Sequence, residues 1–152
     1  MKIPIENLTT DVVPGITVQM PDSEVTEKES YYEWYQSSLV TSFKTMETSG
    51  GILKAWHHVP EFQEIETHID AEMFYFLSGV ALMPFMDIQD GVPLMDTAQI
   101  VRIYAGSQII ISAGKGHYVP VAEGDEPIIV VVVAPQMGDI KMALPEPIEG
   151  VI

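Results

Sequence analysis

Two histidines and two glutamates are spaced so that they could bind one metal ion. Glu66 and His68 are two residues apart, and residues at this spacing on a β-strand point to the same face, about 6.6 Å apart. Glu72 follows four residues after His68, and His117 follows the glycine-rich turn 114–116. Carboxylate oxygens and imidazole nitrogens without sulfur suit Mn²⁺, Fe²⁺, Ni²⁺ or Zn²⁺. The spacing therefore predicts a site for a divalent metal ion.

Two interpretations of these residues are open. Taken singly, His68 would be a surface residue in an acidic loop and His117 a turn residue. Taken together, the four side chains would hold an ion with an open position, which can polarise a substrate oxygen as a Lewis acid. Glu72 is then the candidate for the catalytic general base, provided that it is not itself a firm ligand.

Short strands between glycine and proline turns must position these residues. No long segment shows the 3.6-residue period of a helix, so the pattern predicts an all-β sandwich or barrel. The expected strands are 52–59, 72–77, 80–88 with an interruption at Pro84, 98–104, 107–112, 117–121 and 128–133, and 90–96 is expected to be a loop.

With 152 residues, the chain has the length of one domain. We expect an N-terminal extension of short strands and loops at 1–50 that packs on the barrel, a barrel at 51–136 and a C-terminal tail at 137–152. The segment 31–35 holds four aromatic residues in five positions. We interpret it as closing one end of the barrel or as a dimer contact, rather than as a ligand platform.

Composition excludes several classes of function. The net charge is −15, with a single arginine and six lysines, which argues against binding to nucleic acid or to anionic membranes. There is no apolar run long enough to span a bilayer, and no cysteine for a disulfide or a zinc–thiolate site. The N-terminal residues lack the apolar core of a secretory signal, so we expect a cytoplasmic protein.

The first of the two segments resembles the first sequence motif of the cupin superfamily. That motif reads His-x-His, three or four residues, Glu, six residues, Gly. Here it is Glu66-x-His68, three residues, Glu72, six residues, Gly79, with glutamate in place of the first histidine.

The second segment is similar to the second cupin motif, which reads Gly, five residues, Pro-x-Gly, two residues, His, three residues, Asn. From Gly106 to Val121 every spacing is kept, while Ser112 and Val121 replace the proline and the asparagine. The resemblance implies a double-stranded β-helix, or jelly-roll barrel. It also implies a divalent metal ion (Mn, Ni, Fe or Zn), whose ligands here would be Glu66, His68, Glu72 and His117.

Within the cupins, the second half of the chain looks like the ureidoglycolate lyase (ureidoglycolate hydrolase) branch of allantoin and purine catabolism. The matching stretches are 66–68, 77–80, the strand after Gly106, 117–120 and 144–148. The resemblance implies a metal-dependent carbon–nitrogen lyase that releases glyoxylate and urea from a small 2-hydroxy acid. Another small-molecule cupin enzyme, such as a sugar isomerase or a decarboxylase, and a non-catalytic metabolite-binding cupin remain open.

Four further residues are candidate substrate contacts. Arg102 could clamp a substrate carboxylate, or be a structural arginine. Lys54, Trp56 and His58 share one face of the expected strand 52–59. They would contact the substrate if that face points inward, and would be surface or dimer residues if it points outward. Lys115 is expected in a solvated turn.

The partners expected from the sequence are a small-molecule substrate and a second copy of the chain. The aromatic N-terminal third and the apolar strands suit edge pairing, which predicts a homodimer.

Overall fold

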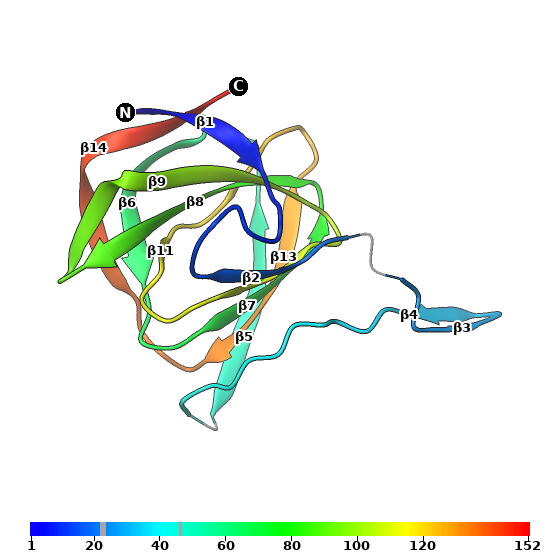
Figure 1. The fold of residues 1–152 in the computed structure, drawn as a ribbon. Coiled ribbons are helices and arrows are strands. Elements are labelled where there is room, and N and C mark those ends of the chain that lie inside the picture. The colour runs from blue at the N-terminus through cyan, green and yellow to red at the C-terminus, as the bar shows by residue number, and fades with distance from the viewer. Residues whose placement is uncertain (22–23, 46) are drawn as a thin grey trace.

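The computed structural model describes residues 1–21, 24–45 and 47–152, which form fourteen strands and contain no helix. A helix able to cross a membrane is accordingly not found in this described part of the chain. The all-β barrel predicted from the sequence is confirmed (Figure 1).

The larger sheet has seven strands in the order β11-β6-β14-β1-β9-β8-β12, and β11 also pairs with β8, so that the sheet closes on itself. β1 runs parallel to both of its neighbours, which makes the sheet mixed. Its strands are β1 (Lys2–Asn7), β6 (Glu61–Thr67), β8 (Val80–Gln89), β9 (Val92–Tyr104), β11 (Gly116–His117), β12 (Val121–Ala122) and β14 (Ile140–Val151).

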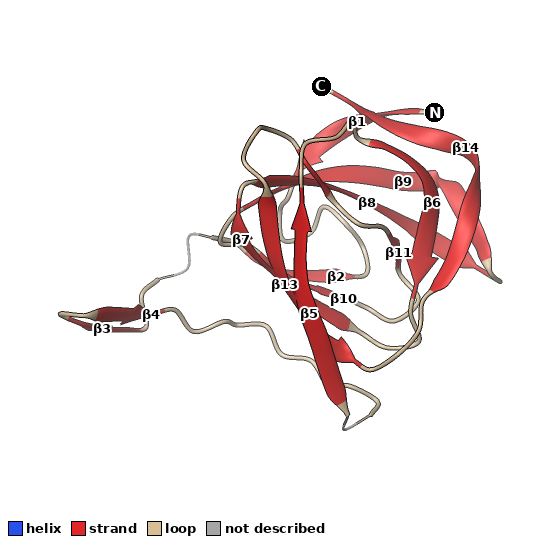
Figure 2. Ribbon diagram, turned by 180° about the vertical axis from the view of Figure 1, so that it is seen from behind, coloured by secondary structure: helices blue, strands red, loops and turns tan. Residues whose placement is uncertain are grey.

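The smaller sheet is antiparallel and has the strand order β2-β10-β7-β13-β5. Its strands are β2 (Ile16–Gln19), β5 (Thr48–Ala55), β7 (Glu72–Ser78), β10 (Gln108–Ile111) and β13 (Ile128–Pro135). A separate hairpin of β3 (Glu27–Glu29) and β4 (Tyr32–Trp34) stands away from both sheets (Figures 1 and 2).

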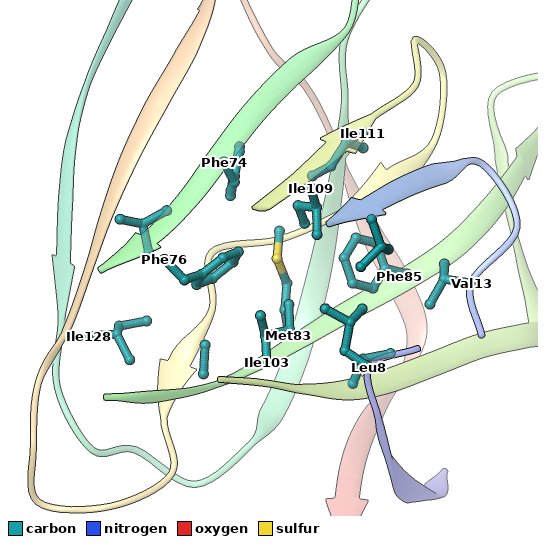
Figure 3. Packing of buried hydrophobic residues seen from close by; sticks show 14 of the residues in the cluster. Leu8, Val13, Phe74, Phe76, Met83, Phe85, Ile103, Ile109, Ile111 and Ile128 are labelled. Carbon is teal, nitrogen blue, oxygen red and sulfur yellow. The ribbon is translucent and has the colours of Figure 1, made fainter. Parts of the chain in front are cut away.

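The main hydrophobic core lies between the two sheets. Phe74 and Phe76 of the five-stranded sheet pack there with Met83, Phe85 and other buried side chains of the larger sheet (Figure 3). Side chains alternate along a strand, so the intervening residues of the larger sheet face away from this core. They form a second cluster inside the curl of that sheet, with members on each of its long strands: Ile3, Phe62, Ile65, Leu82, Met86, Ile100 and Ile148.

The prediction that Pro84 interrupts its strand is wrong, because β8 runs without a break from Val80 to Gln89. On one side of β8, β11 pairs with Phe85 and Met86, and β12 pairs with Ala81 and Leu82. Pro84 lies in the gap between these two short strands, where no partner requires the amide hydrogen that proline lacks. The same gap divides the expected strand 117–121 into β11 and β12.

The expected loop 90–96 is instead the start of a long hairpin strand. Asp90 and Gly91 have positive φ angles of 51° and 76°, as a two-residue hairpin turn requires, and β9 begins at Val92. The expected strand 52–59 is β5, which begins earlier, at Thr48, and ends at Ala55.

The segments placed outside the barrel contribute strands to it. The expected tail 137–152 contains β14, which pairs with β6 and β1. In the expected extension 1–50, β1 joins the larger sheet and β2 the smaller one. Pro145 and Pro147 lie within β14, whose pairing with β6 shifts register between Ala143 and Ile148, and this shift accommodates both prolines.

Candidate metal centre

The two motif segments meet at one end of the space between the sheets. Glu66 on β6 pairs directly with His117 on β11, and His117 pairs with Phe85 on β8. Phe85 is part of the core between the sheets, so the three side chains in this row face the smaller sheet. There Glu72, the first residue of β7, faces them from the opposite side.

One carboxylate oxygen lies between the two imidazoles. The Oε2 atom of Glu72 is 3.0 Å from the Nε2 atom of His117 and 3.2 Å from the Nε2 atom of His68. The Oε1 atom of Glu66 is 4.0 Å from the same nitrogen of His68. All four side chains are largely buried, and His117 is almost completely so.

Backbone carbonyls fix the orientation of both imidazole rings. The Nδ1–H group of His68 donates to the carbonyl of Gly138, at 3.1 Å, and that of His117 donates to the carbonyl of Lys115, at 3.0 Å. A carbonyl can only accept, so in each neutral ring the proton is on Nδ1 and Nε2 carries a lone pair. Both lone pairs then face an oxygen of Glu72 that also only accepts. A cation or additional protons must lie between these atoms for the arrangement to be favourable.

The donor set fits a divalent metal ion. Glu66, His68 and His117 each offer a ligand atom, and these three atoms lie within 4.8 Å of one another. Glu72 stands outside that group of three, although its Oε2 atom is the one closest to both histidines. Two ligand atoms about 2.1 Å from one ion and at right angles to each other are about 3.0 Å apart, which matches the separations around Glu72. The second partner that each imidazole has in a backbone carbonyl is also typical of metal-binding histidines.

The site raises the proton affinity of the carboxyl group of Glu66. Burial raises its pKa above the ordinary value; the imidazoles of His117 and His68 oppose this shift, and Asp139 and Glu72 add to it. The pKa of Asp139 is lowered, first by a hydrogen bond from its own backbone amide. Without a cation, Asp139 therefore loses its proton before Glu66 does. A bound cation would reverse the shift at Glu66, because its charge favours the carboxylate.

The four side chains line a cavity of about 250 Å³. The opposite walls are apolar and come from the smaller sheet, and Asp139 adds a third carboxylate. No lysine or arginine is among the lining residues of this cavity, which are Leu53, Glu66, His68, Glu72, Phe74, His117, Tyr118, Val119, Pro120, Val132, Met137 and Asp139.

Arg102 does not line the cavity. Its guanidinium group binds both carboxylate oxygens of Glu123, with its Nε atom at 3.0 and 2.8 Å, and it also donates to Asn7 at 3.0 Å. The hydrogen bonds to Glu123 raise the pKa of Arg102 and lower that of Glu123. Of the two roles considered for Arg102, these contacts are those of a structural arginine.

The other three candidate substrate contacts also lie outside the cavity. Leu53 lines it, so the neighbouring Lys54 points to the opposite, outer face of β5, with its Nζ atom 5.7 Å from the ring centre of the exposed Trp56. His58 lines a different groove, with Glu61 and Glu64. Of the two alternatives for Lys54, Trp56 and His58, the structure shows the outward one.

Sequence reasoning missed three residues around the site. Asp139 and Tyr118 line the cavity. Lys115, expected in a solvated turn, is buried, and its Nζ atom is 2.6 Å from Asp87 on β8. The one available signal was the position of Lys115 two residues before His117, where its backbone carbonyl accepts the hydrogen bond that orients the imidazole.

No protein-family model matches the sequence, and no curated protein matches it. Solved structures similar to this chain include an oxalate decarboxylase from Bacillus subtilis studied for its Mn(II) centres, with 21% identity and a TM-score of 0.47. Another is the oxalate decarboxylase from Lactobacillus farciminis in complex with formate, with 24% identity and a TM-score of 0.48. The alignments cover 64% and 63% of this chain, but only 24% and 27% of those chains. This chain thus spans about a quarter of their length, and likeness at this level does not assign their activity to it.

Proposed function

We propose that this protein is a metal-dependent enzyme of the cupin type that acts on a small hydroxylated metabolite. The observation that carries the proposal is the contact of both imidazole Nε2 atoms with one oxygen of Glu72, while both Nδ1 atoms are bound to backbone carbonyls. His68, His117, Glu72 and Glu66 would hold the ion. When bound, a divalent ion would supply Lewis-acid polarisation of a substrate oxygen.

The first substrate to consider is ureidoglycolate, in keeping with the sequence resemblance. In its cleavage a base takes the proton of the hydroxyl group, the carbon–nitrogen bond breaks, and the urea nitrogen receives a proton, which leaves glyoxylate and urea. The small volume of the cavity suits a molecule of this size, and Leu53, Phe74 and Val132 provide an apolar wall that limits access of water.

Two carboxylates are candidates for the base. The sequence favoured Glu72, but its oxygen has the position of a ligand between the two histidines. Asp139 lines the same cavity, and unlike Glu72 it makes no hydrogen bond or ion pair with either histidine in the described residues, so we assign the proton-accepting role to Asp139. Its position after Gly138, whose carbonyl orients His68, places it beside the first motif.

The test is to load the protein with Mn²⁺, Ni²⁺ or Zn²⁺ and to measure urea and glyoxylate released from ureidoglycolate. We expect Asp139→Asn to retain bound metal and lose turnover at least about 100-fold, in the range typical of a general base, and Glu72→Gln to lose both. If Glu72→Gln keeps its metal and loses turnover, Glu72 is the base. A metal-loaded protein that releases neither product contradicts the lyase assignment.

One feature of the cavity favours a second candidate. Its lining has three carboxylates and no lysine or arginine, and the nearby Lys141 is half exposed and paired with Asp139 at 3.5 Å, so the metal ion would be the main positive charge for a substrate carboxylate. A neutral polyhydroxy compound avoids that repulsion. An isomerase acting on a sugar is therefore the alternative, and interconversion of an aldose and a ketose by the metal-loaded protein would support it.

A further inference from the structure

Residues 24–45 form an arm that leaves the barrel at the β2 side and returns along the outside of the smaller sheet. The hairpin β3–β4 at its far end stands clear of both sheets (Figures 1 and 2). In the described chain, the hydrogen bonds and ion pairs of residues 26–36 stay within the arm, such as Lys28 with Glu33 at 2.6 Å. An isolated two-stranded hairpin is marginally stable in water, so this one needs a surface to pack on.

The hairpin exposes its aromatic side chains. Tyr31 is 84% exposed, Trp34 52%, Tyr35 44% and Tyr32 37%. Aromatic side chains bury about 150–250 Å² each when they pack, and contiguous exposed apolar groups mark interaction sites. The hairpin therefore has the composition of an interaction site, although its aromatic side chains remain exposed.

The part of the arm nearest β5 shows which surface it fits. Leu39 and Phe43 pack on Ile110 of β10, Met73 of β7 and Ala71, on the outer face of the smaller sheet. This contact is fixed at one end by Asp70, whose carboxylate accepts hydrogen bonds from the amides of Lys44 and Ala71, at 2.7 and 2.8 Å. The arm thus already covers one row of this outer face.

The next row of the same face is only partly covered, with Tyr75 and Val131 half-buried. Ile52 of β5, Val131 of β13 and Tyr75 of β7 lie side by side in the strand register. Ile52 is 76% exposed, and Leu77, two residues along β7 from Tyr75, is 60% exposed. β5 is also the edge strand of its sheet, with a hydrogen-bonding partner on one side only in the described residues.

We propose that the outer face of the smaller sheet binds the β3–β4 hairpin of a second copy of this chain, and that two chains exchange their arms in this way. Every copy has both the aromatic hairpin and the outer sheet face that would bind it. The part of the arm at Leu39 and Phe43, which packs on this face, connects the two. A symmetric pair would therefore satisfy both surfaces of both chains at once.

Area and charge agree with this occupant. The exposed parts of eight exchanged aromatic side chains and the surfaces that they would cover together reach the order of a stable interface, roughly 1,200–2,000 Å². The hairpin carries three glutamates and one lysine, Lys28, so it stays acidic, and Lys54 lies on the outer face next to Ile52. The exposed ammonium group beside an apolar row is suited to an acidic aromatic segment.

The first test is the mass of the full chain in solution by light scattering at about 10–100 µM. The expected result is a dimer for the parent and a monomer for the variant Tyr31→Ser, Trp34→Ser and for Ile52→Lys, with circular dichroism unchanged. Tyr104→Ser is the matched control, because Tyr104 is an exposed aromatic residue on β9 of the other sheet, and it should remain dimeric. A monomeric parent, or a dimer that survives both interface variants, overturns the proposal.

The absence of cysteine permits a second, direct test. In the double variant Trp34→Cys, Ile52→Cys, exchanged arms should give a disulfide-linked dimer on mild oxidation. The control Trp34→Cys, Tyr104→Cys should not form it. A disulfide within one chain would show that the hairpin folds back on its own sheet, and no disulfide would show that it packs elsewhere; either result overturns the proposal. Both tests are independent of metal content and turnover, so they separate this inference from the proposed function.

Discussion

The two faces of the five-stranded sheet differ in how completely they are buried within one chain. On the inner face, Phe74 and Phe76 are buried in the core, and Glu72 contacts two histidines. On the outer face, Ile52 and Leu77 remain in contact with solvent beside a row that the arm covers. Adjacent residues of β7 thus differ sharply: Phe76 is buried in the core, whereas Leu77 is exposed on the outer face. The inner face carries the proposed metal centre, and the outer face is the proposed surface for association.

Replacing adjacent residues of β7 tests this difference in stability. In a background made monomeric by Tyr31→Ser and Trp34→Ser, Phe76→Ala should lower the free energy of unfolding by about 3–5 kcal/mol, because it leaves a cavity in the core. Leu77→Ala should change it by less than about 0.5 kcal/mol. Urea denaturation measures both. Similar losses would mean that the outer face is packed within the single chain.

Metal binding should stabilise the protein through the residues of the inner face. With free Mn²⁺ or Zn²⁺ at about 100 times the dissociation constant, the free energy of unfolding should rise by about 2.7 kcal/mol, which thermal denaturation would record as an increase of about 5–10 °C. The variant His117→Ala should show no such increase. His57→Ala should behave as the parent, because the exposed His57 contacts only the carbonyl of Glu123 among its polar partners in the described residues. An equal increase in His117→Ala would place the metal elsewhere.

The buried ion pair behind His117 should have an intermediate effect. Asp87→Ala leaves the ammonium group of the buried Lys115 without its carboxylate, at 2.6 Å in the parent. The expected loss of stability is about 2 kcal/mol, less than for a fully buried pair because Asp87 is about half exposed. Since Lys115 also provides the carbonyl that orients His117, metal affinity should fall by about 10-fold. The double variant Asp87→Ala, Lys115→Met should recover stability; if it does not, the uncompensated charge is not the cause.

The smallest effect is expected at Arg102 and Glu123, away from both faces of the smaller sheet. The pKa of Glu123 is lowered by its hydrogen bonds with Arg102, so the pair contributes stability above the ordinary pKa of a glutamate and loses it as the pH falls through the lowered value. The difference between the parent and Glu123→Gln should be about 1 kcal/mol at pH 7 and disappear as the pH falls through the lowered pKa of Glu123. Turnover should be unchanged, whereas a large loss of turnover would restore Arg102 as a substrate contact.

Short strands between turns predicted the all-β barrel, because strand patterns are local, and the resemblance to two cupin motifs predicted that Glu66, His68, Glu72 and His117 lie together. Glu66 and His117 pair in register even though 51 residues separate them in the chain. Asp139 was not predictable in the same way, since its position depends on how β14 returns beside β6.

The sequence also could not decide which residues of β5 and β9 point toward the cavity. Ile52 and Leu53 are both apolar, so alternation alone does not tell which of them faces the cavity; packing against β13 and the core places Leu53 inside. Arg102 lies between the buried Val101 and Ile103, and the carboxylate that binds it, Glu123, comes from a turn far along the chain. Asp90-Gly91 did contain a local hairpin signal, which a reading of the following residues as a loop overlooked.

The most direct test of the metal centre is elemental analysis of protein purified without chelators, and again after incubation with Mn²⁺, Ni²⁺ and Zn²⁺. We predict about one equivalent of metal per chain in the parent and none in the double variant Glu66→Ala, His117→Ala, with the fold of both verified by circular dichroism. A parent that remains free of metal after all three incubations would contradict the account. The lone pairs around Glu72 would then be satisfied by protons, and the protein would be a metabolite-binding barrel rather than a metal-dependent enzyme.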